Sequence, residues 1–206
     1  MSINLLRAAG LAAAGFALPT LASAATVTAG AGGFDNGFAT QITYDDAADR
    51  GTNNDRDNAV NALGATDSSF FEIGFGSTVD FTFGTLFNTE ASIFEVTFGQ
   101  PANAPESADV YAGINGVFVQ VGSVTNADAF DGATVTFHQV GVFDTLRLID
   151  TSPLSSSFQT ASNGTLLGGF DVNSVQVSAV PVPAAGLLLL SAVGGMAAMR
   201  RRKSKA

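Results

Sequence analysis

The segment ADVYAGINGVFVQVG, residues 108–122, carries the clearest local folding signal in the chain. Two alternating apolar runs, 108–114 and 117–122, are separated only by Asn115 and Gly116. Asn-Gly is the pair favoured in two-residue type I′ turns, because both central residues of that turn need positive φ angles. The segment therefore predicts an antiparallel β-hairpin.

The same two-residue period occurs N-terminal to the hairpin. In residues 78–84 (TVDFTFG) the valine and both phenylalanines fall on one face, which predicts that they point into the core. In residues 92–99 (SIFEVTFG) the period predicts that Phe94 and the other even-numbered apolar residues point inward. Ile93 and Glu95 are then expected on the opposite face.

Short alternating runs of this kind continue along the middle of the chain, where no stretch has a sustained helical period. The 17 phenylalanines and the absence of tryptophan indicate Phe as the main large core residue. Runs punctuated by Gly, Asn and Asp indicate an all-β fold, an antiparallel jelly-roll-like β-sandwich of about nine strands. The expected strands are 38–44, 70–76, 78–84, 92–99, 108–114, 117–122, 133–140, 145–150 and 170–178.

Residues 1–24 have the layout of a secretory signal peptide, which predicts an N-terminal signal helix and export through the Sec route. A basic residue and the free amine precede a short apolar run. Ala22, Ser23 and Ala24 then supply the small residues that signal peptidase requires, which places the mature start at Ala25. A buried amphipathic helix is the alternative interpretation.

Residues 180–206 (VPVPAAGLLLLSAVGGMAAMRRRKSKA) form a second processing segment. A proline-containing pentapeptide precedes the apolar run 184–199, which as a helix spans about 24 Å of a hydrocarbon core of roughly 30 Å. We expect a single transmembrane helix, with its basic end held on the cytoplasmic side. The pentapeptide is Val180, Pro181, Val182, Pro183 and Ala184, and the basic stop-transfer cluster is Arg200, Arg201, Arg202, Lys203 and Lys205.

This order of motif, apolar segment and basic end resembles the PEP-CTERM class of bacterial sorting signals, in its VPLPA-CTERM variant. Val182 stands where that variant usually has Leu. The resemblance implies processing by an exosortase, a membrane-embedded protease or transpeptidase that cuts near the motif. It also implies a Gram-negative bacterium, an inner-membrane anchor with the ectodomain outside the cytoplasm, and transfer to the cell surface or extracellular matrix. A permanent single-pass anchor is the alternative.

The ectodomain, expected over residues 25–179, resembles the discoidin-like or galactose-binding-like jelly-roll domains. The residues that carry the resemblance are 61–65 (NALGA), 108–122, 146–152 (LRLIDTS) and 170–175 (FDVNSV). The chain departs from the family pattern at Thr66, where Pro is common, at Ser68, where Gly is common, and at Phe118, often Trp. The resemblance implies the sandwich fold, and it makes an extracellular polysaccharide a candidate partner.

Charge and composition exclude several classes of function. Residues 25–179 hold all 18 acidic residues and three basic ones, so a nucleic-acid partner is not expected. The absence of cysteine excludes disulfides, thiolate nucleophiles and cysteine-ligated zinc. The single histidine, His138, alternates outward from Val135 and Phe137, and no G-x-S-x-G element is present. We therefore assign no catalytic residue and expect no enzyme.

Residues 45–58 (DDAADRGTNNDRDN) are dense in hard oxygen ligands of the kind that calcium prefers. The EF-hand pattern does not fit, because Asn58 and Gly64 stand where that loop requires Gly and Glu. A solvated acidic loop is the alternative to a calcium site, and we expect no other cofactor. The candidate ligands are Asp49, Asn53, Asp55 and Asp57.

Together these patterns predict an exported, non-enzymatic surface or extracellular-matrix protein that is anchored through its C-terminal sorting signal. Its ectodomain would serve a binding or structural role, and signal peptidase and an exosortase would process its ends. The alternative is a secreted or surface-attached hydrolase, for example a polysaccharide-active one, built on the same sandwich.

Overall fold

The computed structural model describes residues 24–29, 36–52, 55–96, 105–129, 132–139, 141–153, 159–160 and 166–180. The strands are β1 (Ala24–Thr28), β2 (Gln41–Asp45), β3 (Phe71–Glu72), β4 (Thr78–Glu95), β5 (Ser107–Ile114), β6 (Val117–Thr125), β7 (Ala133–Thr136), β8 (Phe143–Asp150), β9 (Gln159–Thr160), β10 (Leu166–Leu167) and β11 (Asp171–Ala179). Two short helices are η2 (Ala59–Ala62) and α1 (Asn126–Ala129). β9 and β10 pair only with each other, and the other nine strands are connected by hydrogen bonds.

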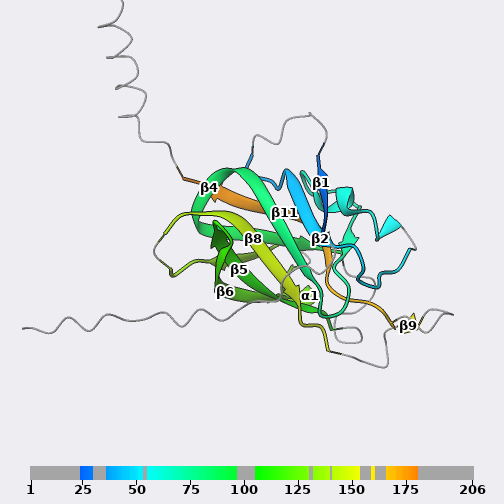
Figure 1. Ribbon diagram of the computed structural model, residues 1–206. Helices are drawn as coiled ribbons and strands as arrows, with labels where there is room; N and C mark the ends of the chain where they lie inside the picture. The colour runs from blue at the N-terminus through cyan, green and yellow to red at the C-terminus, as the bar shows by residue number, and fades with distance from the viewer. Residues whose placement is uncertain are drawn as a thin grey trace, which may run out of the picture.

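The 18-residue strand β4 belongs to both layers of the sandwich (Figure 1). Its first half pairs with β2 and β8 in the order β1-β2-β4-β8-β5-β6. Its second half pairs with β7 and β11, and β11 also pairs with β3. Between the halves the register shifts, and Gly84 has a φ of +65°, which lets the strand bend. The described strands therefore form the predicted antiparallel β-sandwich, with two expected strands merged into one.

The core between the layers is rich in phenylalanine, as the composition predicts. Phe87 is fully buried at the bend of β4, and its ring lies 5.3–6.0 Å from those of Phe83, Phe137 and Phe143. Phe83 and Phe87 lie on β4, Phe137 directly follows β7 and Phe143 begins β8, so the cluster joins the bend to these two strands. Edge-to-face and tilted ring pairs of this kind add to the stability gained from burial alone.

The predicted hairpin is confirmed. Ile114 pairs with Val117, and Asn115 and Gly116 have φ angles of 53° and 77°, the positive values that a type I′ turn requires. The expected inward face of residues 78–84 is confirmed too, because its valine and both phenylalanines are buried.

The predicted inward face of residues 92–99 is wrong over the part that the structure describes. Ile93 and Glu95 are buried, whereas Phe94 is half-buried on the other face. A Cβ atom added to Gly132 would lie 2.4 Å from Phe94 Cε1, so the segment before β7 covers this ring from outside. Because apolar residues occupy both faces of the run, its period could not show which face lies inward.

The two predicted processing segments fall mainly outside the described residues. Of their residues, the structure describes Ala24, which begins β1, and Val180, which follows β11. The signal peptide, the remainder of the VPVPA motif and the basic cluster stay predictions. No helix in the described parts of the chain has the length and apolar character needed to cross a membrane.

Candidate functional site

Five carboxylates gather at one end of the sandwich, which we call the acidic end. Its members are Glu72, Glu95, Glu106, Asp150 and Asp171. They meet because β3, β4 and β8 end at this edge while β5 and β11 begin there, and paired residues such as Asp171 and Glu72 lie opposite each other. All but Glu106 are at most 4% exposed. Buried carboxylates are rare in proteins unless donors or countercharges hold them.

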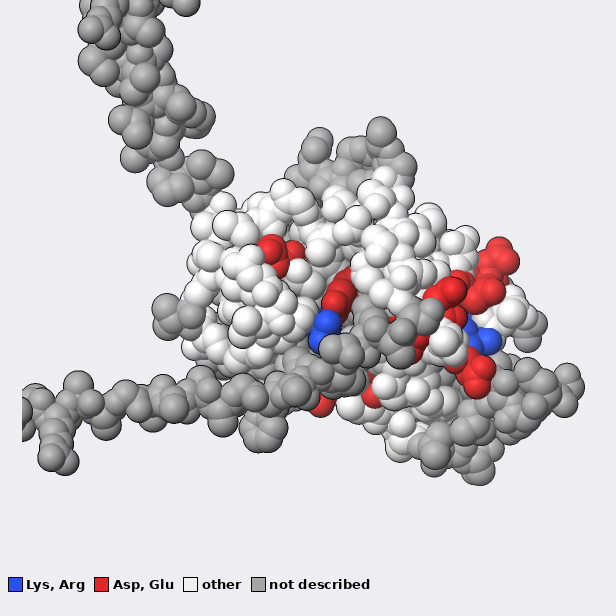
Figure 2. Space-filling view, viewed as in Figure 1, with Lys and Arg blue, Asp and Glu red and all other residues white. Residues whose placement is uncertain are grey.

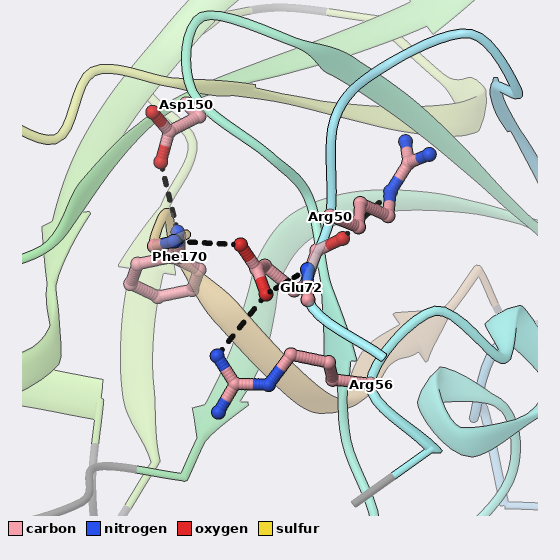
Figure 3. Close-up of polar contacts among 7 residues, drawn as sticks. Arg50, Arg56, Glu72, Asp150 and Phe170 are labelled. Carbon is pink, nitrogen blue, oxygen red and sulfur yellow. Dashed lines mark hydrogen bonds and ion pairs between the residues drawn. The ribbon is translucent and has the colours of Figure 1, made fainter. Parts of the chain in front are cut away.

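Glu72 is fully buried and is held by donors from two distant segments (Figure 3). The Gly168 N–H donates to its Oε1 at 2.8 Å, and the Gly51 N–H donates to its Oε2 at 3.1 Å. Arg56 Nη1 forms an ion pair with the same Oε2 at 3.1 Å. Glu72 therefore ties the loop 46–58 and the residues before β11 to the end of β3.

Arg50 strengthens the same junction from the other side of β3. Its Nε donates to the backbone carbonyl of Glu72 at 2.8 Å, and its guanidinium lies 5.0 and 4.8 Å from the ring centroids of Tyr44 and Phe71. Burial lowers the pKa of Arg50, and the charges of Tyr44 and Asp45 partly offset this effect. The segment 45–58, predicted as a surface loop, thus turns both of its arginines towards the sandwich.

Asp150 joins the end of β8 to two neighbouring turns. Its Oδ2 accepts from the Phe170 N–H at 2.8 Å and from the Ser152 hydroxyl at 2.7 Å, and its Oδ1 accepts from the Gly76 N–H at 3.1 Å. Burial raises the pKa of Asp150, while these hydrogen bonds act in the opposite direction because they stabilise the ionised form. Its role in the described structure is to fasten backbone segments together.

Glu106 and Asp171, next to Glu95, form the part of the acidic end with fewer donors among the described residues. Glu106 Oε2 and Asp171 Oδ1 are buried and accept no hydrogen bond from the described residues. Burial, the charges of Asp171 and Glu95, and a hydrogen bond with Glu95 raise the pKa of Glu106 to about 10. Burial also raises the pKa of Asp171 well above its ordinary value, against the charge of Arg56. Glu106 and Asp171 can therefore hold a proton or another cation.

The same geometry does not favour a glycosidase pair at Glu95 and Glu106. Retaining and inverting glycosidases separate their two carboxyl groups by roughly 5–9.5 Å, so that the sugar or a water fits between them. The hydrogen bond between Glu95 and Glu106 brings the two groups into direct contact. A substrate atom has no room between them in this arrangement.

The predicted calcium ligands lie apart from this cluster. Asp49, Asp55 and Asp57 are exposed on the loop, and Asn53 falls outside the described residues. Within the described ranges no three acidic or histidine side chains already form a set of metal ligands. Calcium at this loop stays a prediction. His138 is exposed next to buried Phe137, as its alternation predicts.

The visible face of the molecule carries more acidic than basic side chains. Figure 2 shows the largest group of red acidic side chains at the right, beside blue basic ones, with smaller red groups at the centre and upper left. Sequence reasoning found the negative charge but not the buried cluster, since it placed Glu95 on the outer face. A usable signal was present, because Glu72 and Asp171 follow phenylalanines in the apolar runs FFEIG and GGFDV.

A polar hollow of about 440 Å³ lies near the opposite end, where β4 bends. Its lining includes Asn36, Glu90, Ser92, Gln176 and Ser178, which offer hydrogen-bond donors and acceptors. A second hollow of about 490 Å³ is lined by residues of β4 and by Asp144 and Thr145 of β8.

The chain matches no protein-family model and no curated protein. It is similar to the solved family 32 carbohydrate-binding module (CBM32) of AlyQ in complex with 4,5-unsaturated mannuronic acid, at 14% identity, over 66% of this chain and 92% of that one, with a TM-score of 0.42. The family 32 module of C. perfringens NanJ in complex with galactose is 14% identical, over 75% of this chain and 91% of that one, with a TM-score of 0.43. A Ruminococcus gnavus GH29 fucosidase in complex with fucose is 13% identical over 69% of this chain, which spans 25% of the fucosidase chain, with a TM-score of 0.43. The predicted likeness to jelly-roll domains is confirmed as a structural similarity to family 32 carbohydrate-binding modules.

Proposed function

We propose that this protein is an exported, non-enzymatic surface or extracellular-matrix protein whose sandwich serves a binding or structural role. A C-terminal sorting segment would anchor it in the inner membrane and then be processed by an exosortase, after signal peptidase has removed the N-terminus. The observation that carries the proposal is the junction between the sandwich and the VPVPA motif. β11 pairs as far as Ala179, and the Val180 N–H donates to the Leu86 carbonyl at 2.8 Å.

This junction supports a defined orientation of the sandwich. The fold continues to the first residue of the motif, so no long linker separates the two. β11 begins at Asp171, in the acidic end, and at about 3.3 Å per residue its nine residues cover roughly 26 Å. The acidic end and the start of the tail therefore lie at opposite ends of β11. A sandwich held through its tail would present the acidic end to the surroundings.

A binding or structural role is favoured over hydrolysis by the state of the acidic groups. Glu72 and Asp150 are occupied by backbone and side-chain donors, and Glu95 contacts Glu106 directly. As partner we propose an extracellular polysaccharide. The polar hollow beside β11 supports this class, because neutral sugar hydroxyls require neighbouring donors and acceptors such as amides and hydroxyls.

The mass of the mature protein tests the sorting part of the proposal. The full-length chain is produced in a Gram-negative host that has an exosortase, and the protein is recovered from membrane and medium. We expect a start at Ala25 and an end near Ala184. A Pro181→Ala/Pro183→Ala variant should stay unprocessed, whereas the control Pro153→Ala, at an exposed position, should be processed normally. A wild-type chain that ends at Ala206 would show a permanent anchor instead.

Binding and turnover assays test the role of the sandwich. The purified chain is applied to glycan arrays and incubated with polysaccharides and generic hydrolase substrates. We expect glycan binding without turnover. Clear release of sugar would contradict the proposal and favour the hydrolase alternative.

A further inference from the structure

The buried carboxylates of the acidic end differ in how the protein satisfies them. Glu72 and Asp150 accept hydrogen bonds from backbone N–H groups of distant segments. Asp171 is 4% exposed, yet its Oδ1 accepts no hydrogen bond from any described residue, and neither does Glu106 Oε2. An unsatisfied buried acceptor costs about 1–3 kcal/mol, more when it is charged, so among the described residues these two oxygens leave room for a further donor or a cation.

The charges around Asp171 indicate the sign of that group. Glu72, Glu95 and Asp150 repel its carboxylate, and Arg56 attracts it. Arg56 is already engaged, because its Nη1 lies 3.1 Å from Glu72 Oε2. The cluster therefore has more carboxyl groups than Arg56 can balance if they are all ionised, and a bound cation would replace the protons that otherwise relieve their repulsion.

We propose that Glu95, Glu106 and Asp171 bind a calcium ion at the acidic end. Carboxylate oxygens are the hard ligands that calcium prefers, and calcium accepts six to eight oxygens in flexible geometry, including backbone carbonyls. Magnesium requires a near-ideal octahedron and keeps several of its waters, which suits a buried, irregular cluster less well.

The calcium site forms by a small rearrangement. Within the described ranges the acidic side chains do not yet converge as a set of metal ligands. Glu106 is the member that can close the site, because it is half-buried and precedes the first residue of β5, whereas Glu95 and Asp171 are buried within paired strands. The ion then links the end of β4, the start of β5 and the start of β11.

This site is distinct from the acidic loop 45–58, whose aspartates 49, 55 and 57 are exposed. It does not depend on the proposed sorting or glycan binding, and the assay below measures neither. A result against calcium therefore leaves the proposed function standing, and failure of that function leaves the calcium site standing.

The test uses the full-length chain purified in mild detergent. Calcium binding is measured by isothermal titration calorimetry, and thermal unfolding is followed by circular dichroism in EDTA and in calcium. We expect one calcium site. At a hundredfold excess of calcium over its Kd, we expect a Tm about 5–10 °C above that in EDTA. No heat of binding together with an unchanged Tm would overturn the proposal.

Two variants and one matched control locate the ion. Glu106→Gln and Asp171→Asn keep side-chain size and remove one ligand charge each, so each should weaken calcium binding at least tenfold. The control replaces Asp49, Asp55 and Asp57 by Asn and should bind calcium like the wild type. Glu106→Gln, at a half-buried position outside the strands, keeps the test valid if Asp171→Asn fails to fold.

Other outcomes of this comparison would also overturn the proposal. Unchanged calcium affinity in Glu106→Gln, with its far-UV spectrum intact, would remove Glu106 from the site. Loss of binding in the control alone would assign calcium to the loop. Magnesium binding as tight as calcium binding would contradict the choice of metal.

Discussion

Replacement of Arg56 by methionine should strongly destabilise the sandwich. Arg56 Nη1 lies 3.1 Å from Oε2 of Glu72, whose side chain is 0% exposed, while that of Arg56 is 18% exposed. Methionine keeps much of the apolar stem but removes the positive charge, whose guanidinium carbon lies 5.2 Å from the centroid of the Phe70 ring. Glu72 would then keep its two backbone donors without a countercharge, and Asp171 would lose the attraction of Arg56.

The size of the effect follows from the burial of the pair. Removing one partner of a buried ion pair costs about 3–5 kcal/mol, because the remaining charge is left uncompensated. Domains of this size have free energies of unfolding of about 5–15 kcal/mol, so the loss is a large share of the total. Tm should fall by roughly 6–20 °C.

Urea unfolding and thermal unfolding of the full-length chain in EDTA measure the effect. Arg50→Met is the control, because it removes a charge from the same loop but its hydrogen bonds go to the backbone carbonyls of Glu72 and Ala48, not to a carboxylate. It also loses the guanidinium contacts with the rings of Tyr44 and Phe71. We expect it to cost about 1–2 kcal/mol. In a cycle with Glu72→Gln, the double variant should lose less than the sum of the single losses. An Arg56→Met loss below about 1 kcal/mol, or strictly additive losses in the cycle, would refute the reasoning.

Three further predictions concern the core, the hairpin and pH. Phe87→Ala removes a fully buried ring that packs against three others and should cost about 3–5 kcal/mol in urea unfolding; a loss below 1 kcal/mol would contradict the described core. Gly116→Ala places a Cβ atom at a φ of 77° and should cost about 1–2 kcal/mol, whereas a neutral result would argue against the type I′ turn. Because the pKa of Glu106 is raised from 4.5 to about 10, its contribution to stability is complete below pH 4.5 and is lost as the pH rises towards 10. In EDTA, Tm should therefore fall between pH 5 and pH 9, and Glu106→Gln should flatten this fall; an equal slope in that variant would contradict the assignment. The carboxylates that face Glu106 are those of Glu95, Asp150 and Asp171.

The local features of the fold could be predicted from the sequence because they depend on neighbouring residues. The type I′ hairpin follows from Asn115 and Gly116 between two alternating runs, and the inward face of residues 78–84 follows from their two-residue period. The continuous strand β4 could not be predicted in this way. Its two halves pair with different strands, and the bend between them places residues 91–95 in the second layer. Only the pairing with β7 and β11 determines which face of these residues points into the core.

For the acidic end, too, the sequence predicted the local composition but not the contacts between distant segments. Composition revealed a strong excess of acidic residues over basic ones in the ectodomain, and it directed attention to the loop 45–58, where they are densest. Four of the five carboxylates come instead from the ends of separate strands, each next to an apolar residue in the chain, and Glu106 directly precedes β5. Burial of a charge depends on donors and countercharges from distant segments, as with Gly168 and Arg56 at Glu72, so no local pattern predicts it.

The sequence by itself determined the strand period, the hairpin turn and the antiparallel β class, and it predicts the two processing segments at the ends of the chain. The tertiary structure alone decided that β4 crosses between the layers and that Glu95 faces inward. It also decided that the acidic end lies at one end of β11 and the start of the tail at the other. The physical reason is the distance along the chain between the residues that interact. Side-chain alternation and turn conformation depend on residues a few positions apart, whereas burial of a carboxylate requires partners that only the folded chain brings together.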